Sequence, residues 1–311
     1  MGKAFFHDEV RCTSHFDNAK PFWHLYTSGL LSGIIFSNDD DFIFGMNLLA
    51  LCADKFPQLK IYTFALMSNH VHVIFSGDKA EGERMFELFR SRLKRYLTSK
   101  ERVLDWNAFS ASWISIDDLQ ALRNEIVYTN RNGYLAHNSY LPHSYPWGAG
   151  YLYFNPICYN LLNGKALRDC SVDDRRKICH SKDISVSTRL LIKDQTILPS
   201  SFCYVKEGEA LFRHPHHYFY LLTKNWEAYS QIAKRMSDSV FLSDEEMYAT
   251  VCSMCITYYN VKRPDLLSAP DKVDMARRMH SEYNASNKQI RRILKLELSQ
   301  VETLFPKPSG D

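Results

Sequence analysis

Residues 66–75 read LMSNHVHVIF, an apolar run that two histidines, His70 and His72, interrupt. The run predicts a β-strand over residues 71–75 that is apolar enough to lie inside a sheet. Because side chains alternate between the two faces of a strand, His70 and His72 should point the same way, and Val71 and Val73 the other way. Two imidazoles would then converge on one point. The spacing alone fits packing as well as it fits metal binding.

The segments around this run predict a small antiparallel sheet. Residues 22–27, 59–66 and 111–116 have strand character, and residues 59–66 are close enough to residues 71–75 to form an antiparallel hairpin. Helical periodicity covers residues 39–56, 83–99 and 117–132, with Asn38 or a following aspartate as the first N-cap and Gly133 as the last C-cap. This order predicts an α+β domain in which an antiparallel sheet carries its helices on one side.

The remainder of the chain is expected to be mainly helical. A strand is expected within residues 199–213, and a helical pattern begins at Pro215. Three helix starts are predicted near the end of the chain, at Ser268 with Pro270, at Ser286 with Gln289, and at Ser299 with Glu302. We therefore expect three parts: residues 1–155, a helical region over 156–265 of unclear role, and a helix-turn-helix-like DNA-binding module over 266–311. A purely structural three-helix cap explains the last part equally well.

Composition limits the class of protein. The chain has 311 residues, of which 45% are hydrophobic and 23% charged, as is ordinary for a globular protein. Neither a signal peptide nor an apolar run long enough to cross a membrane is visible, so a cytoplasmic, nucleoid-associated protein without a membrane partner is expected. The net charge of +3 is small, so an argument for nucleic-acid binding has to rest on local clusters of basic residues.

Two such clusters occur on predicted helices. One lies on the helix over residues 83–99 and consists of Arg84, Arg90, Arg92, Lys94 and Arg95. The other lies in the last part of the chain and consists of Lys288, Arg291 and Arg292. Charges on a helix usually face solvent without a partner, but the local excess of positive charge on the first helix favours contact with DNA phosphates.

The helix over residues 117–132 adds a second polar group. Tyr128 lies about half a turn away from the apolar stripe formed by Leu119 and Ile126, at 100° per residue. Asn124, Tyr128 and Asn132 repeat at every fourth residue, so they should share one polar stripe. Farther on, the aromatic loop over residues 144–148 could stack on DNA bases or pack back onto its own domain.

Together, these residues resemble the one-tyrosine HUH transposases, in particular the REP-associated tyrosine transposases related to small insertion-sequence transposases. The resemblance covers residues 20–155 and rests on the His70-Val71-His72 element, the basic helix after it, the Tyr128-to-Asn132 spacing and the aromatic loop. It implies a ferredoxin-like HUH domain. The family usually has proline after the asparagine, whereas Gly133 follows here, which leaves the subfamily open.

The resemblance implies a chemistry as well. His70, His72 and Asn132 would bind a divalent cation, Mg²⁺ or Mn²⁺, and Tyr128 would be the nucleophile that forms a 5′-phosphotyrosine with single-stranded or hairpin DNA. Imidazole and amide oxygen ligands suit such cations, and a phenol with its usual pKa near 10 needs activation. Glu125, one turn before Tyr128, is a weak candidate for helping this activation and is not assigned to the predicted site. A homodimer in which a partner's helix completes the site is compatible with the family.

Two other classes of function remain. One is a DNA-binding regulator that keeps the fold but has lost its catalytic activity. The other is a metal-dependent hydrolase of small phosphates in which Tyr128 is structural. The presence of all four site residues argues against the first, and the basic helix argues against the second.

Overall fold

The structure, a computed structural model, describes residues 2–17, 20–29, 33–136, 140, 144–161, 163–181, 185–224, 226–236, 242–283 and 285–306. The chain forms two compact units, Met1–Thr223 and Lys224–Asp311. The predicted division into three functional parts stays a prediction. Within the described ranges, no helix combines the length and the apolar character needed to cross a membrane.

Four antiparallel strands organise the first unit, in the order β2-β3-β1-β4. Their bounds are β1 (Phe22–Thr27), β2 (Lys60–Leu66), β3 (Val71–Ser76) and β4 (Ala111–Ile116). Strand β3 is internal, and every one of its residues is buried. The structure thus confirms the α+β class, the hairpin of β2 and β3, and the interior position of the strand that carries His72.

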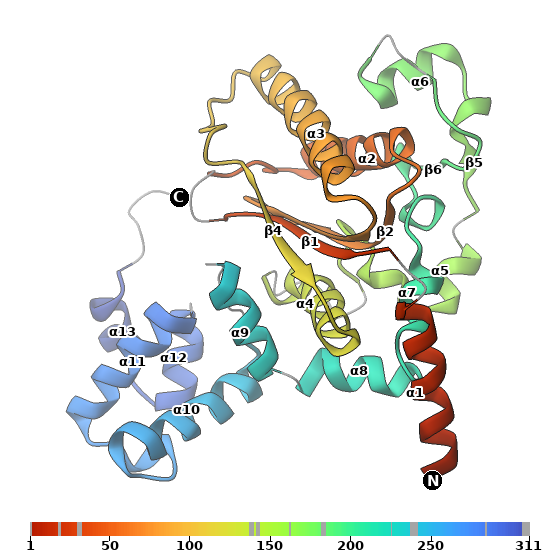
Figure 1. Cartoon of the computed structure of the whole chain (residues 1–311). Coiled ribbons are helices and arrows are strands. Elements are labelled where there is room, and N and C mark those ends of the chain that lie inside the picture. The colour runs from red at the N-terminus through yellow and green to blue at the C-terminus, as the bar shows by residue number, and fades with distance from the viewer. Residues whose placement is uncertain are drawn as a thin grey trace. The chain divides into compact units, whose positions relative to one another are not determined.

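Helices cover both faces of this sheet. Helices α2 (Asp39–Lys55) and α3 (Lys79–Ser99) lie on one side, and α4 (Leu119–Ala136) lies on the other (Figure 1). Leu49 of α2 and Phe86 of α3 line a small apolar cavity together with Val73, whereas α4 places Tyr128 beside His72. The prediction that all helices lie on one side is wrong in this respect. Strand β3 is buried on both faces, so both faces need cover.

Local sequence explains where the helices begin, but Gly133 does not end α4. The side chain of Asn38 accepts a hydrogen bond from the backbone N–H of Asp41, which confirms the predicted cap of α2. Helix α4 continues through Gly133 to Ala136, so the predicted C-cap is wrong. A Cβ at position 133 would overlap the ring of Tyr145. Glycine therefore stands here because the Tyr145 ring packs directly on the helix backbone.

Smaller elements complete the first unit. They are α1 (Gly2–Asp17), α5 (Pro156–Leu161), β5 (Lys165–Ala166), α6 (Val172–Cys179), β6 (Leu191–Lys193), β7 (Thr196–Ile197), α7 (Val205–Ala210) and α8 (Pro215–Lys224). Strands β5, β6 and β7 form a second, antiparallel sheet. The prediction of a strand within residues 199–213 is wrong. Cys203 forms an isolated bridge with Ile61, and the chain then enters α7.

The second unit is helical. Its helices are α9 (Trp226–Met236), α10 (Asp244–Tyr259), α11 (Ala269–Tyr283), α12 (Asn287–Leu294) and α13 (Leu298–Leu304). Ser286 caps α12 by accepting a hydrogen bond from the N–H of Gln289, as the sequence predicts. The predicted start at Ser299 is wrong. Glu297 is the N-cap of α13, and its backbone N–H donates to the side chain of Gln300.

Candidate active site

Strand pairing brings three side chains to the face of the sheet that α4 covers. Only one of them, His72, is a site residue predicted from the sequence. Tyr26 of β1 lies directly opposite His72 of β3 in the antiparallel register. Residues opposite each other share a face, as do residues two apart in one strand. His24, Tyr26 and His72 therefore face the same side of the sheet.

The two predicted histidines lie together, as the sequence predicts. The ring centroids of His70 and His72 are 4.9 Å apart, with the ring planes at 87°. Nδ1 of His70 is 2.7 Å from the side-chain oxygen of Asn69, whose amide donates to the backbone carbonyl of Gly29. These contacts orient the His70 ring from the β2–β3 turn.

Helix α4 adds the predicted nucleophile. The ring centroid of Tyr128 lies 5.7 Å from that of His72, and its side chain is 2% exposed. Asn132, one helical turn later, is also buried. The structure thus brings Tyr128, His70 and His72 together from different elements. The role of Asn132 as a third ligand stays a prediction.

A second pair of residues, His24 and Glu125, extends this cluster, and neither belongs to the site as predicted from the sequence. Nδ1 of His24 lies 2.8 Å from Oε2 of Glu125, and Nε2 of His24 lies 3.0 Å from Nδ1 of His72. All three side chains are buried. The alternation of β1 could have placed His24 on one face, but only its pairing with β3 identifies His72 as its neighbour.

Tyr26 is a second tyrosine beside the histidines. Its ring is stacked on His72 with centroids 6.5 Å apart, and it is 5.8 Å from the ring of His24. Tyr26 is half-buried, whereas Tyr128 is buried. The site therefore contains two phenols near His72, and an experiment on the nucleophile has to distinguish them.

The donor set fits a divalent cation of the predicted kind. Hydrogen bonds engage Nδ1 of both His70 and His72, so Nε2 is the atom through which each would hold a cation. Together with the predicted amide oxygen of Asn132, the two imidazole nitrogens would make a mixed nitrogen and oxygen donor set of a kind that such cations accept. Among the described residues, no three His, Cys, Asp or Glu side chains form a metal-binding group. Both ring nitrogens of His24 lie within hydrogen-bonding distance of other side chains, those of Glu125 and His72.

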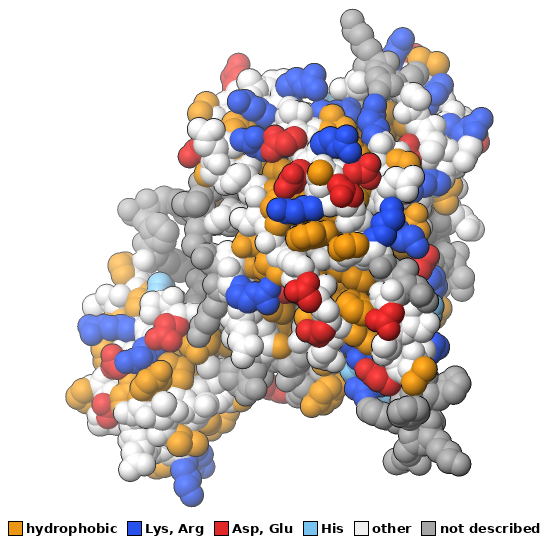
Figure 2. Space-filling view, viewed as in Figure 1, with side chains coloured by type: hydrophobic (Ala, Val, Ile, Leu, Met, Phe, Trp, Pro, Cys, Tyr) orange, Lys and Arg blue, Asp and Glu red, His pale blue; other side chains and the backbone are white. Residues whose placement is uncertain are grey.

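Two of the basic residues of helix α3 make hydrogen bonds within the protein. Arg90 donates to the backbone carbonyl of Trp106, and Arg92 donates to that of Cys179. Arg84, Lys94 and Arg95 are exposed. A guanidinium nitrogen of Arg84 lies 3.4 Å from Oε1 of Glu81. Over α3, basic side chains alternate with acidic ones (Figure 2). Lys94 and Arg95 are thus the more accessible candidates for phosphate contact.

The basic residues of α12 lie on the exposed face of that helix. Lys288, Arg291 and Arg292 are exposed, whereas Ile290 and Ile293 are buried. Arg292 forms an ion pair with Asp244 of α10, with a shortest distance of 2.8 Å. Lys288 and Arg291 are therefore the better placed of the three to contact DNA.

The described part of the aromatic loop packs on its own domain. The hydroxyl of Tyr145 donates to the backbone carbonyl of Leu66 at 2.5 Å, and burial raises the pKa of this phenol well above its usual value. Trp147 is stacked on Phe42 with ring centroids 4.9 Å apart. These contacts favour the packing alternative over base stacking for both rings.

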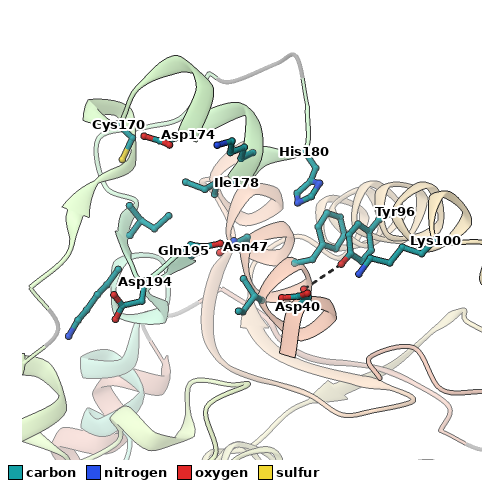
Figure 3. A pocket seen from close by; sticks show the side chains of 15 residues that line it. Asp40, Asn47, Tyr96, Lys100, Cys170, Asp174, Ile178, His180, Asp194 and Gln195 are labelled. Atoms are coloured by element: carbon teal, nitrogen blue, oxygen red, sulfur yellow. Dashed lines mark hydrogen bonds between the residues drawn. The ribbon is translucent and has the colours of Figure 1, made fainter. Parts of the chain in front are cut away.

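A cavity of about 650 Å³ lies elsewhere in the first unit, between α2, the end of α3, α6 and the β6–β7 hairpin (Figure 3). Tyr96, Lys100 and His180 contribute to its lining. Burial lowers the pKa of His180, and the charges of Arg92 and Lys100 lower it further. The cavity contains none of the predicted catalytic residues. On chemical grounds, we therefore place the candidate site at the histidine cluster, which consists of His24, His70, His72, Glu125 and Tyr128.

Comparison with known proteins identifies no relative. No family model, no curated protein and no solved structure matches the chain. The assignment of function therefore rests on the geometry and chemistry of the histidine cluster.

Proposed function

We propose that the protein is a transposase-like endonuclease and strand transferase that acts on single-stranded or hairpin DNA. Tyr128 is the nucleophile, and His70, His72 and Asn132 hold a divalent cation, Mg²⁺ or Mn²⁺. The observation that carries the proposal is the approach of Tyr128 on α4 to His72 on β3, with His70 next to it. Three residues predicted from two separate motifs lie in one buried cluster.

A bound divalent cation would polarise the scissile phosphate and neutralise part of its charge. The chain supplies the remaining parts of the reaction. The His70 and His72 rings are oriented by Asn69 and His24, respectively. The rigid helix α4 holds the Tyr128 ring against His72. Positioning of this kind supplies a large share of catalysis in phosphoryl transfer.

The reaction exchanges one phosphate ester bond for another. The Tyr128 hydroxyl loses its proton, and its oxygen forms a bond to phosphorus as the bond to the 3′ oxygen breaks. The 3′ oxygen takes up a proton and leaves as a 3′-hydroxyl. A 5′-phosphotyrosine remains, and attack by another 3′-hydroxyl completes strand transfer and restores the tyrosine.

A second function has one observation in its favour. Tyr128 is 2% exposed and His72 is fully buried, so DNA reaches them only if the site opens. A catalytically inactive DNA-binding regulator derived from such a transposase would need no opening. It would use the exposed basic residues of α3 and α12 for DNA contact.

Incubation with hairpin oligonucleotides separates the two functions. In the presence of Mg²⁺ or Mn²⁺, the enzyme should form a protein–DNA adduct that resists denaturant, and a chelator added before the DNA should prevent its formation. The variant His70→Ala/His72→Ala should bind the hairpin but form no adduct. Specific hairpin binding without any adduct from the wild-type protein would favour the regulator, and an adduct from the double variant would overturn the proposed metal site.

A further inference from the structure

We propose that His24 and Glu125 are positioning residues that fix the tautomer of His72, so that His72 offers its Nε2 lone pair to the cation. This inference rests on the proposed function, because it assigns these residues a role at the same site. Neither residue has a place in the site predicted from sequence.

The three side chains form a hydrogen-bonded chain within the core. Oε2 of Glu125 lies 2.8 Å from Nδ1 of His24, and Nε2 of His24 lies 3.0 Å from Nδ1 of His72. Glu125 is 2% exposed, and both histidines are fully buried. Hydrogen bonds in a buried network of low dielectric constant are strong, which favours a single arrangement of the protons.

The direction of the hydrogen bonds follows from the carboxylate together with a singly protonated His24, the state that the proposal assigns to this residue. An ionised Glu125 can only accept, so Nδ1 of His24 carries a proton and donates it. In a neutral His24, Nε2 is then the acceptor, and Nδ1 of His72 must be the donor. A neutral His72 that is protonated at Nδ1 has its lone pair at Nε2. Metal-binding histidines commonly have such a partner for the other ring nitrogen.

The fold links this chain of hydrogen bonds to the nucleophile. Glu125 precedes Tyr128 by three residues in α4, and side chains three apart lie on the same side of a helix. The ring of Tyr128 lies 6.4 Å from that of His24 and 5.7 Å from that of His72. Helix α4 thus carries both the nucleophile and the carboxylate that orients His72 through His24.

His70 provides an internal comparison. Its Nδ1 lies 2.7 Å from the Asn69 amide oxygen, which is an acceptor supplied by the adjacent residue. An amide oxygen also selects the tautomer protonated at Nδ1. A change at Glu125 should therefore alter the tautomer of His72 and leave that of His70 unchanged.

Nitrogen-15 NMR of the full-length protein with labelled histidines tests the inference without a metal. We expect His72 to be protonated at Nδ1 in the wild-type protein. In Glu125→Gln, the amide can donate as well as accept, so His72 should populate both tautomers while His70 keeps its own. Gln120→Ala, at an exposed position of the same helix, is the matched control and should leave both histidines unchanged.

Titration with Mn²⁺, followed by the electron paramagnetic resonance of the free ion, gives a second readout. Glu125→Gln and His24→Phe should each bind Mn²⁺ about 10–100-fold more weakly than the wild-type protein, the usual effect of removing such a partner. Gln120→Ala should bind it with wild-type affinity. A circular dichroism spectrum equal to that of the wild-type protein checks that each variant is folded.

The outcomes separate the inference from the proposed function. If wild-type His72 is protonated at Nε2, the inference is overturned, whether or not the variants fold. It is overturned equally if Glu125→Gln keeps the tautomer and the Mn²⁺ affinity of the wild-type protein. If His72 has the expected tautomer but the wild-type protein neither binds Mn²⁺ nor forms a DNA adduct, the proposed function fails and the hydrogen-bonded chain is only structural.

Discussion

The ring of Tyr128 meets the imidazole of His72 at 84°, with the ring centroids 5.7 Å apart. Tyr128 thereby contributes to the packing of α4 on the sheet, as well as lying in the candidate site. We expect Tyr128→Phe to change the free energy of unfolding by less than about 1.5 kcal/mol, because the ring remains. Tyr128→Ala should cost about 3–5 kcal/mol. Urea unfolding measures both, and a large loss in Tyr128→Phe would show that the hydroxyl, more than the ring, stabilises the helix.

Gly133 and Tyr145 form a second tight contact of α4. A Cβ at position 133 would overlap the Tyr145 ring, so Gly133→Ala should destabilise the protein by about 1–3 kcal/mol. In a Tyr145→Ala background the same substitution should be neutral or stabilising, because alanine favours a helix by about 1 kcal/mol over glycine. A double-mutant cycle in urea measures the difference. Equal costs in the two backgrounds would mean that the ring is not the obstacle.

An ionic cluster on α1, α4 and α8 should make stability depend on pH. Hydrogen bonding and charge from Arg123 lower the pKa of Glu9, while burial, with Arg213 and Arg123 nearby, lowers the pKa of His217 to about 4. The folded chain therefore binds fewer protons than the unfolded chain at both groups. Their stabilising contribution is present above the unfolded pKa values and is lost as pH falls, for His217 between about 6.5 and about 4.

Thermal unfolding at several pH values between these limits checks this prediction. The unfolding midpoint of the wild-type protein should fall as the pH decreases. In His217→Asn the fall should be smaller, because the new side chain does not titrate. A midpoint that rises on acidification, or an equal fall in both proteins, would contradict the assignment.

The exposed basic residues of α3 should govern the salt dependence of DNA binding. Replacement of Lys94 and Arg95 by glutamine should weaken binding of single-stranded DNA. It should also reduce the slope of log affinity against log salt by about 1.4, as expected for two lost phosphate contacts. Fluorescence anisotropy at a series of salt concentrations measures both quantities.

Arg92→Gln serves as the comparison for this measurement. Arg92 donates to the backbone carbonyl of Cys179, so its replacement should lower the unfolding midpoint and change the salt slope little. An unchanged slope in the Lys94 and Arg95 variant would place the DNA-binding surface elsewhere, with Lys288 and Arg291 as the next candidates.

The sequence predicted the local elements well because their signals are local. Strands β1 and β4 have their predicted bounds, and the alternation of residues 70–72 placed both histidines on one face. The role of Gly133 was missed because it depends on the ring of Tyr145, which lies beyond the end of α4 in the sequence. The small sheet of β5, β6 and β7 has strands of two or three residues, too short for a periodic signal.

The residues of the candidate site likewise divide into those with a local sequence signal and those without one. The His70 and His72 pair and the helix bearing Tyr128 each have a spacing that can be seen in the sequence. His24 and Glu125 are 101 residues apart, and their contact depends on β1 pairing beside β3 and on α4 covering that face. No local pattern contains this information. The same is true of Tyr26, which becomes a candidate only through its position opposite His72.

The role of Tyr128 as nucleophile is tested most directly by identifying the residue that carries the DNA. After incubation with a hairpin oligonucleotide and Mn²⁺, nuclease and trypsin digestion followed by mass spectrometry should find the phosphoryl remnant on the peptide NEIVYTNR, residues 124–131, at Tyr128. Tyr128→Phe should abolish the adduct, and Tyr26→Phe should retain it. A remnant on Tyr26, or an adduct that persists in Tyr128→Phe, would show that Tyr128 is not the nucleophile.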